Sequence, residues 1–182
     1  MINVGEQLVS SYLRYIRHCD FTQTSLYTIQ SQGDIDVVGL NRTDQRAYIC
    51  EVAIHLTGSG IQYTKNGKVN NVDKLTEKFC KDIEYAEEYL SEYDKHFMLW
   101  SPIVKGARMP HIEEVKENIM NWCKIEIELV VNEKFQECLT ELRDYAKSQT
   151  RVLQCPLLRL MQIEEVVNKY VTTLSDKSRA QS

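Results

Sequence analysis

The chain has 182 residues, of which 43% are hydrophobic, and a formal net charge of −4 at pH 7. This length and apolar content suit one domain with a single core. The net negative charge counts against a protein that binds nucleic acid over most of its surface, but it is compatible with a local basic groove. No apolar run approaches the roughly 20 residues needed to cross a bilayer, and no leader pattern opens the chain, so we expect a soluble, cytoplasmic protein without a membrane partner.

The first predicted elements are a helix over residues 3 to 18 and a strand or irregular segment over residues 20 to 31. Val9 and Leu13 lie one helical turn apart, and Glu6 precedes Val9 by three residues, so Glu6 shares their inward face. The second segment mixes Thr, Tyr and Ile with polar neighbours, which is typical of a strand. Glu6 also has an ordinary explanation, because the helix dipole favours an acid in the first turn.

A pair of adjacent strands is predicted over residues 33 to 55, where two runs rich in β-branched and apolar residues flank a polar turn. Side chains alternate across a strand, so Asp34 and Asp36 share one face, and Glu51 and His55 share a face of the next strand. An ionised carboxylate on an apolar strand is costly unless a positive group meets it. A divalent cation is a suitable partner.

The sequence Gly-Asp-Ile-Asp at residues 33 to 36, followed by Cys-Glu-Val at residues 50 to 52, resembles the core of the PD-(D/E)XK nuclease superfamily. The likeness is to archaeal Holliday-junction resolvases and related small nuclease-like proteins, whose usual pattern is Gly-Glu-Ile-Asp, a turn, then Val-Glu-Val-Lys. Asp34 stands where that pattern has its first Glu. The resemblance implies a restriction-endonuclease-like core, in which a helix, three strands, a helix and a strand follow in order.

The resemblance also implies a site. Asp36, Glu51 and the backbone carbonyl of Val52 would hold Mg²⁺ or Mn²⁺, and Glu6 would reach the same place from the first helix. The motif lysine, which positions or activates the attacking water in the superfamily, is replaced by Ala53. Catalysis therefore requires a positive group from elsewhere in the chain.

A second hairpin is predicted over residues 62 to 69, because Asn66-Gly67 lies between β-capable residues. Lys65 and Lys68 at its tip would contact a phosphate backbone, as would His55 at the end of the preceding strand. The alternative interpretation is a solvated loop.

A long helix is predicted from Asn71 to about Glu92, with lysines flanking its apolar stripe. In some members of the superfamily the catalytic lysine has moved to this helix, so the resemblance makes Lys74 and Lys78 the first candidates to replace it. Lys65 of the preceding hairpin is the third. The alternative is a solvent face held by ordinary pairs, such as Lys78 with Asp82.

The remaining chain predicts alternating helices and strands. In order these are a strand (95 to 104), a helix from Pro110 with Ile112, Val115, Ile119 and Trp122 inward, a peripheral strand (125 to 131), a helix from Asn132, a helix from Pro156 to Leu174, and a polar tail (175 to 182). We therefore expect a single α/β domain over residues 1 to 174, with a mixed central sheet flanked by helices and a C-terminal helix-strand-helix-helix extension. The last helix would pack on the sheet or mediate a homodimer or another protein contact.

Two functions fit these expectations. One is a metal-dependent nuclease that hydrolyses phosphodiester bonds in DNA, or in RNA, with an altered lysine position. The other is an inactive protein of the same fold that acts as a nucleic-acid-binding or protein-interaction subunit. Asp36, Glu51 and Glu6 favour the first, and Ala53 favours the second. A coincidental motif would instead leave the acids pointing away from each other.

Overall fold

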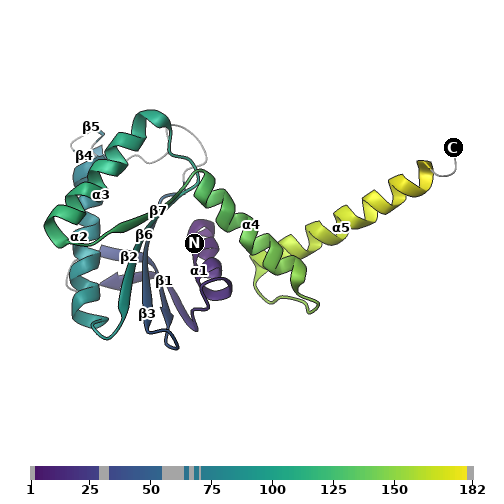
Figure 1. The fold of residues 1–182 in the computed structure, drawn as a ribbon, viewed down its shortest axis with the longest axis horizontal. Helices are drawn as coiled ribbons and strands as arrows, with labels where there is room; N and C mark the ends of the chain where they lie inside the picture. The colour runs from purple at the N-terminus through teal and green to yellow at the C-terminus, as the bar shows by residue number, and fades with distance from the viewer. Residues whose placement is uncertain (1–2, 29–32, 55–63, 66–67, 70, 180–182) are drawn as a thin grey trace.

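The computed structural model describes residues 3–28, 33–54, 64–65, 68–69 and 71–179, and it has an α/β fold (Figure 1). One sheet contains five strands in the order β1-β2-β3-β6-β7, and β4 and β5 form a separate two-stranded ladder. The elements in chain order are α1 (Val4–Tyr15), β1 (Phe21–Thr28), β2 (Gly33–Asn41), β3 (Arg46–Val52), β4 (Thr64–Lys65), β5 (Lys68–Val69), α2 (Asn71–Tyr89), β6 (Asp94–Ser101), the 3₁₀ turn η1 (Gly106–Arg108), α3 (Met109–Cys123), β7 (Ile127–Val131), α4 (Glu133–Ser148) and α5 (Pro156–Arg179).

The large sheet is mixed. β1, β2 and β3 pair antiparallel, while β6 is parallel to both β3 and β7. Parallel neighbours need a crossover connection, and α2 and α3 provide the two crossovers. The predicted mixed sheet flanked by helices is confirmed.

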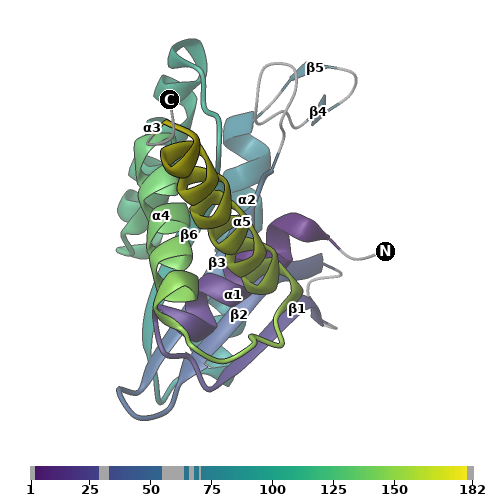
Figure 2. The ribbon, with the colours of Figure 1, turned by 90° about the vertical axis from the view of Figure 1, so that its right-hand side faces the viewer.

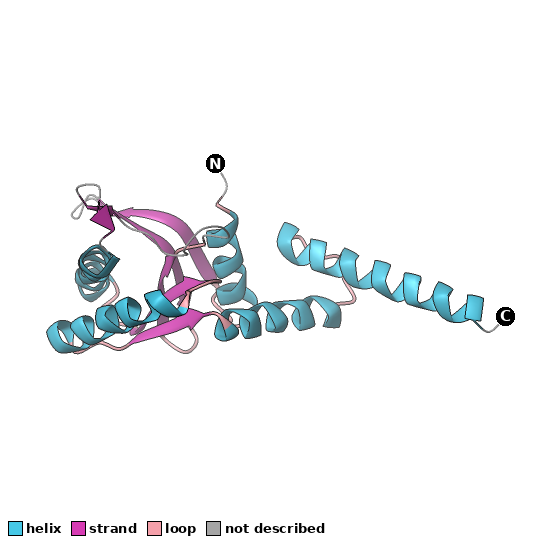
Figure 3. Cartoon of the chain, turned by 90° about the horizontal axis from the view of Figure 1, so that it is seen from above, coloured by secondary structure: helices cyan, strands magenta, loops and turns pink. Residues whose placement is uncertain are grey.

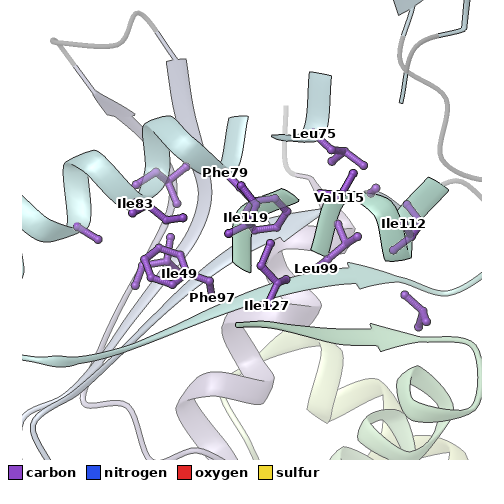
Figure 4. Packing of buried hydrophobic residues seen from close by; sticks show 14 of the residues in the cluster. Ile49, Leu75, Phe79, Ile83, Phe97, Leu99, Ile112, Val115, Ile119 and Ile127 are labelled. Carbon is purple, nitrogen blue, oxygen red and sulfur yellow. The ribbon is translucent and has the colours of Figure 1, made fainter. Parts of the chain in front are cut away.

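The sheet is covered on both faces, giving three layers (Figures 1 and 3). α2 and α3 lie on one face, where their apolar stripes meet the side chains of β3, β6 and β7 (Figure 4). α1 and α4 lie on the opposite face and enclose a second cluster around Trp100. In the α2 stripe, Leu75, Phe79 and Ala86 are fully buried and Ile83 is nearly so, as the helical spacing predicts.

Three details differ from the expectations. Trp122 is 67% exposed, because Cys123 takes the next inward position of α3 and packs against the core. α5 continues to Arg179, so residues 175–179 are helical rather than a tail. The predicted helix of residues 71 to 92 ends at Tyr89. Among the described residues, no helix is both long and apolar enough to cross a membrane.

Candidate active site

The site begins where β2 and β3 stop pairing. Their ladder runs from Asn41 opposite Arg46 to Val37 opposite Cys50. The next residue of β2 is Asp36, and its Oδ2 accepts a hydrogen bond of 2.7 Å from the backbone N–H of Val52. The carboxylate thus replaces a backbone carbonyl as the acceptor for β3, which holds Asp36 in the fork between the strands.

Glu51 comes from the adjacent strand. It lies in β3 between Ile49 and Ala53, two buried residues of the cluster beneath α2, and alternation places all three on the same face. Glu51 is only 2% exposed. A carboxylate at this depth requires a positive partner.

Lys78 of α2 is that partner. Its Nζ lies 3.0 Å from Oδ1 of Asp36 and forms an ion pair with Oε2 of Glu51. Lys78 follows Leu75 by three residues and precedes Phe79, so the buried stripe of α2 carries its side chain toward the sheet. Burial alone would lower the pKa of the Lys78 ammonium, but the charges of Glu51 and Asp36 more than offset burial, and the pKa is raised. Lys78 therefore stays charged at neutral pH.

The predicted pairing of Lys78 with Asp82 on a solvent face is wrong, because Lys78 points to the sheet and its ion pairs are with the acids of β2 and β3. Lys74 is partly exposed and lies 3.8 Å from Glu77. Lys81 pairs with Glu77 at 3.2 Å. The solvent-face interpretation thus holds for Lys74 and Lys81.

Asp82 is an additional buried acid that the sequence analysis did not single out. It lies one turn after Lys78, and its Oδ2 has no hydrogen-bond partner among the described residues. Burial, followed by the charges of Glu51 and Asp36, raises the pKa of Asp82 to about 8 although Lys78 opposes the shift. The sequence could have predicted the burial of Asp82, since Asp82 follows Leu75 by seven residues and so shares its inward helical position.

A hollow of about 240 Å³ opens next to these groups between α2 and the start of β2. It is lined by three lysines, three acids and one glycine, namely Lys74, Lys78, Lys81, Asp34, Glu77, Asp82 and Gly33. Asp34 is exposed at its rim. The lining is polar and of mixed charge, which suits water, a cation or a phosphate group more than an apolar ligand.

Glu6 lies elsewhere. It is buried at the start of α1, on the helix that covers the opposite face of the sheet, where it accepts hydrogen bonds from Asn3 and from the hydroxyl of Ser25. In the ladder of β1 and β2, Thr24 is opposite Val37 and Leu26 is opposite Ile35, and Ser25 lies between these two pairs. The contacts of Glu6 are thus with Asn3 and Ser25 rather than with Lys78.

The predicted nucleic-acid contacts are described only in part. The second hairpin is confirmed, because β4 and β5 pair antiparallel with Lys65 opposite Lys68, beyond the start of α2 (Figure 2). The side chains of both lysines, and the whole of His55, lie outside the described residues.

The donors at the fork between β2 and β3 are oxygen atoms, which hard metal ions prefer. Asp36 and Glu51 present carboxylate oxygens to one cationic group, and hard cations such as Mg²⁺ take one or two carboxylates and fill their remaining positions with water. Within the part of the chain that the structure describes, no three His, Cys, Asp or Glu side chains are grouped so that they could share a metal. Asp36 and Glu51 are thus compatible in their chemistry with a cation held by two carboxylates and water.

No protein-family model matches the chain, and neither a curated protein nor a solved structure matches it significantly.

Proposed function

We propose that this protein is a metal-dependent nuclease of the PD-(D/E)XK type, in which Lys78 of α2 replaces the lysine missing at Ala53. One observation carries the proposal: the Lys78 ammonium lies 3.0 Å from Asp36 and is paired with Glu51. Two acids and one cation from three separate elements converge, as the chemistry requires. This convergence supports the motif, because acids of a coincidental motif are expected to point away from each other.

The arrangement is hard to explain as a device for stability. A buried ion pair is often no better for stability than apolar residues of similar volume, because the charges lose their hydration. The rest of this face is a continuous apolar cluster, so apolar side chains would fit there. Acids kept at such a cost are typical of functional sites.

Each residue has a defined role in the proposal. Asp36, Glu51 and the carbonyl of Val52 would hold Mg²⁺ or Mn²⁺, which when bound supplies charge neutralisation for the phosphate and lowers the pKa of a coordinated water. The charged Lys78 donates hydrogen bonds that orient the attacking water or a phosphate oxygen. Lys74 and Lys81 at the hollow attract the phosphodiester backbone, and DNA is the favoured substrate.

The test is a cleavage assay on DNA and RNA substrates with Mg²⁺ or Mn²⁺. The native chain is compared with Asp36→Asn, Glu51→Gln and Lys78→Met, and each of the three is expected to lose roughly 10² or more in rate. Lys134→Met is the control, because Lys134 lies on α4 on the opposite face of the sheet, where it pairs with Glu137. Folded native protein that cleaves none of the substrates and binds no divalent cation in calorimetry would refute the proposal.

The second candidate is an inactive nuclease-fold subunit that binds nucleic acid or another protein. Lys78 favours this inactive subunit, because its ammonium already neutralises Asp36 and Glu51 without a metal. The two candidates differ in calorimetry: the inactive subunit would bind nucleic acid with no dependence on divalent cations.

A further inference from the structure

The C-terminal helix α5 extends away from the three layers of the molecule (Figures 1 and 3). Its first turns are anchored. Leu158 is fully buried, and the side chain of Gln162 accepts a hydrogen bond from the N–H of Leu153 and donates to the carbonyls of Gln149 and Arg151. These contacts fix the direction in which the helix leaves the body.

The anchored helix presents large apolar side chains to solvent. Six of them are between 46% and 67% exposed: Leu160, Ile163, Val166, Val167, Tyr170 and Val171. Single exposed apolar residues are common on protein surfaces, but a contiguous group of this kind marks an interaction site. The side chains lie on a helix whose buried contacts are made by other residues, so the body of the protein does not require them for its own packing.

The spacing of these residues indicates what they contact. Leu160, Ile163, Val167 and Tyr170 follow one another in steps of three and four residues. This is the repeat of a coiled-coil seam, with Leu160 and Val167 at one core position and Ile163 and Tyr170 at the other. The seam covers roughly three helical turns, or about 16 Å of helix.

The residues that flank the seam distinguish between partners. In this repeat the flanking positions are Arg159, Glu164, Val166 and Val171, so two of them are charged, and with opposite signs. Charges at such positions normally set partner choice and repel wrong partners. Here one positive and one negative flank, Arg159 and Glu164, would not repel an identical helix, and Val166 widens the apolar surface.

We propose that α5 is a self-association surface, which pairs along the Leu160, Ile163, Val167 and Tyr170 seam with α5 of a second copy of this chain. A two-fold axis brings the same apolar seam of each copy together, so each core residue meets an apolar residue. The pairing also places two copies of the Lys78 site in one assembly. This self-association through α5 does not depend on the proposed nuclease activity.

The experiment is sedimentation velocity of the full chain over a wide range of protein concentration. The native chain is expected to reach twice its monomer mass of 21.2 kDa. Val167→Asp places a charge in the seam and should weaken the association at least about tenfold. Thr172→Asp adds the same charge to an exposed residue of α5 outside the seam and should leave the association unchanged. Circular dichroism checks that both variants keep their helix.

Two results would overturn the proposal. One is a native chain that stays monomeric at every concentration. The other is a dimer that Val167→Asp and Thr172→Asp weaken equally, which would place the interface elsewhere. Binding of the monomeric chain to anionic phospholipid vesicles, with no dimer, would instead identify a lipid surface as the occupant and would also overturn it.

Discussion

The Nζ atom of Lys78 lies 3.0 Å from Oδ1 of Asp36, although 42 residues separate them in the chain. α2 crosses the sheet over the point where β2 and β3 separate, and its buried stripe carries Lys78 to the acids. The same ammonium pairs with Glu51, which has almost no contact with solvent. The stability of this region and its proposed chemistry thus depend on the same three charges.

Replacing Lys78 by Met should destabilise the fold. Removal of one partner from a buried ion pair leaves an uncompensated charge and costs about 3–5 kcal/mol. Urea unfolding at neutral pH measures the free energy, and Lys81→Met, which removes an exposed charge from the same helix, should change it by less than about 1 kcal/mol. If the two variants lowered the free energy of unfolding equally, the ion pairs of Lys78 with Asp36 and Glu51 would contribute nothing to stability.

Divalent cations should stabilise the native chain, and should stabilise Lys78→Met more. A ligand that binds only the folded state adds about 2.7 kcal/mol at 100 times its Kd. In the variant, Mg²⁺ would also neutralise carboxylates left without the ammonium, so part of the lost stability should return. Thermal melts with Mg²⁺ and with chelator make the comparison, and Glu51→Gln should lose most of the effect. A melting temperature of Lys78→Met that Mg²⁺ leaves unchanged would contradict the metal site.

Asp82 should make the stability depend on pH. Its pKa is about 8 in the folded protein, against an ordinary value near 3.9 in the unfolded chain, so the folded state binds the additional proton between these values. The contribution of Asp82 to the free energy of unfolding is fully present below about pH 4 and is lost as the pH rises through about 8. Stability should therefore fall over this window in the native chain and fall less in Asp82→Asn.

Urea midpoints measured from about pH 5 to about pH 9 check this expectation. Asp144→Asn, which removes an exposed acid from α4, is the control and should keep the pH dependence of the native chain. If Asp82→Asn and the native chain gave parallel curves, Asp82 would not be the titrating group.

Gly39 should not tolerate a larger side chain. A Cβ at this residue would lie 2.8 Å from Cδ1 of Leu13 and 3.0 Å from Sγ of Cys19, and both neighbours are buried where α1 packs on β2. Gly39→Ala should therefore cost about 1–3 kcal/mol through overpacking. Gly106→Ala is the control, because a Cβ there meets nothing within 4 Å and should be nearly neutral. Urea unfolding of both variants measures the difference.

The sequence alone determined the order and type of the main elements, because the spacing of apolar residues is a local property. The stripe of α2, the antiparallel pair of β2 and β3, and the pairing of β4 with β5 could all be recognised in this way. Trp122 could not be placed, because Trp122 and Cys123 both continue the α3 stripe and the packing against the core selects Cys123.

Only the tertiary structure decided which groups meet. Lys74, Lys78 and Lys81 all flank the same stripe, and the way α2 crosses the fork brings Lys78 alone of the three into ion pairs with the strand acids. The burial of Asp82 likewise depends on neighbours far along the chain, as its raised pKa reflects. Tertiary contacts also decide whether α5 packs on the sheet or projects from it. Hydrogen bonds between Gln162 and the α4–α5 connection set the direction of this helix. Such contacts join residues far apart in sequence, and periodicity carries no information about them.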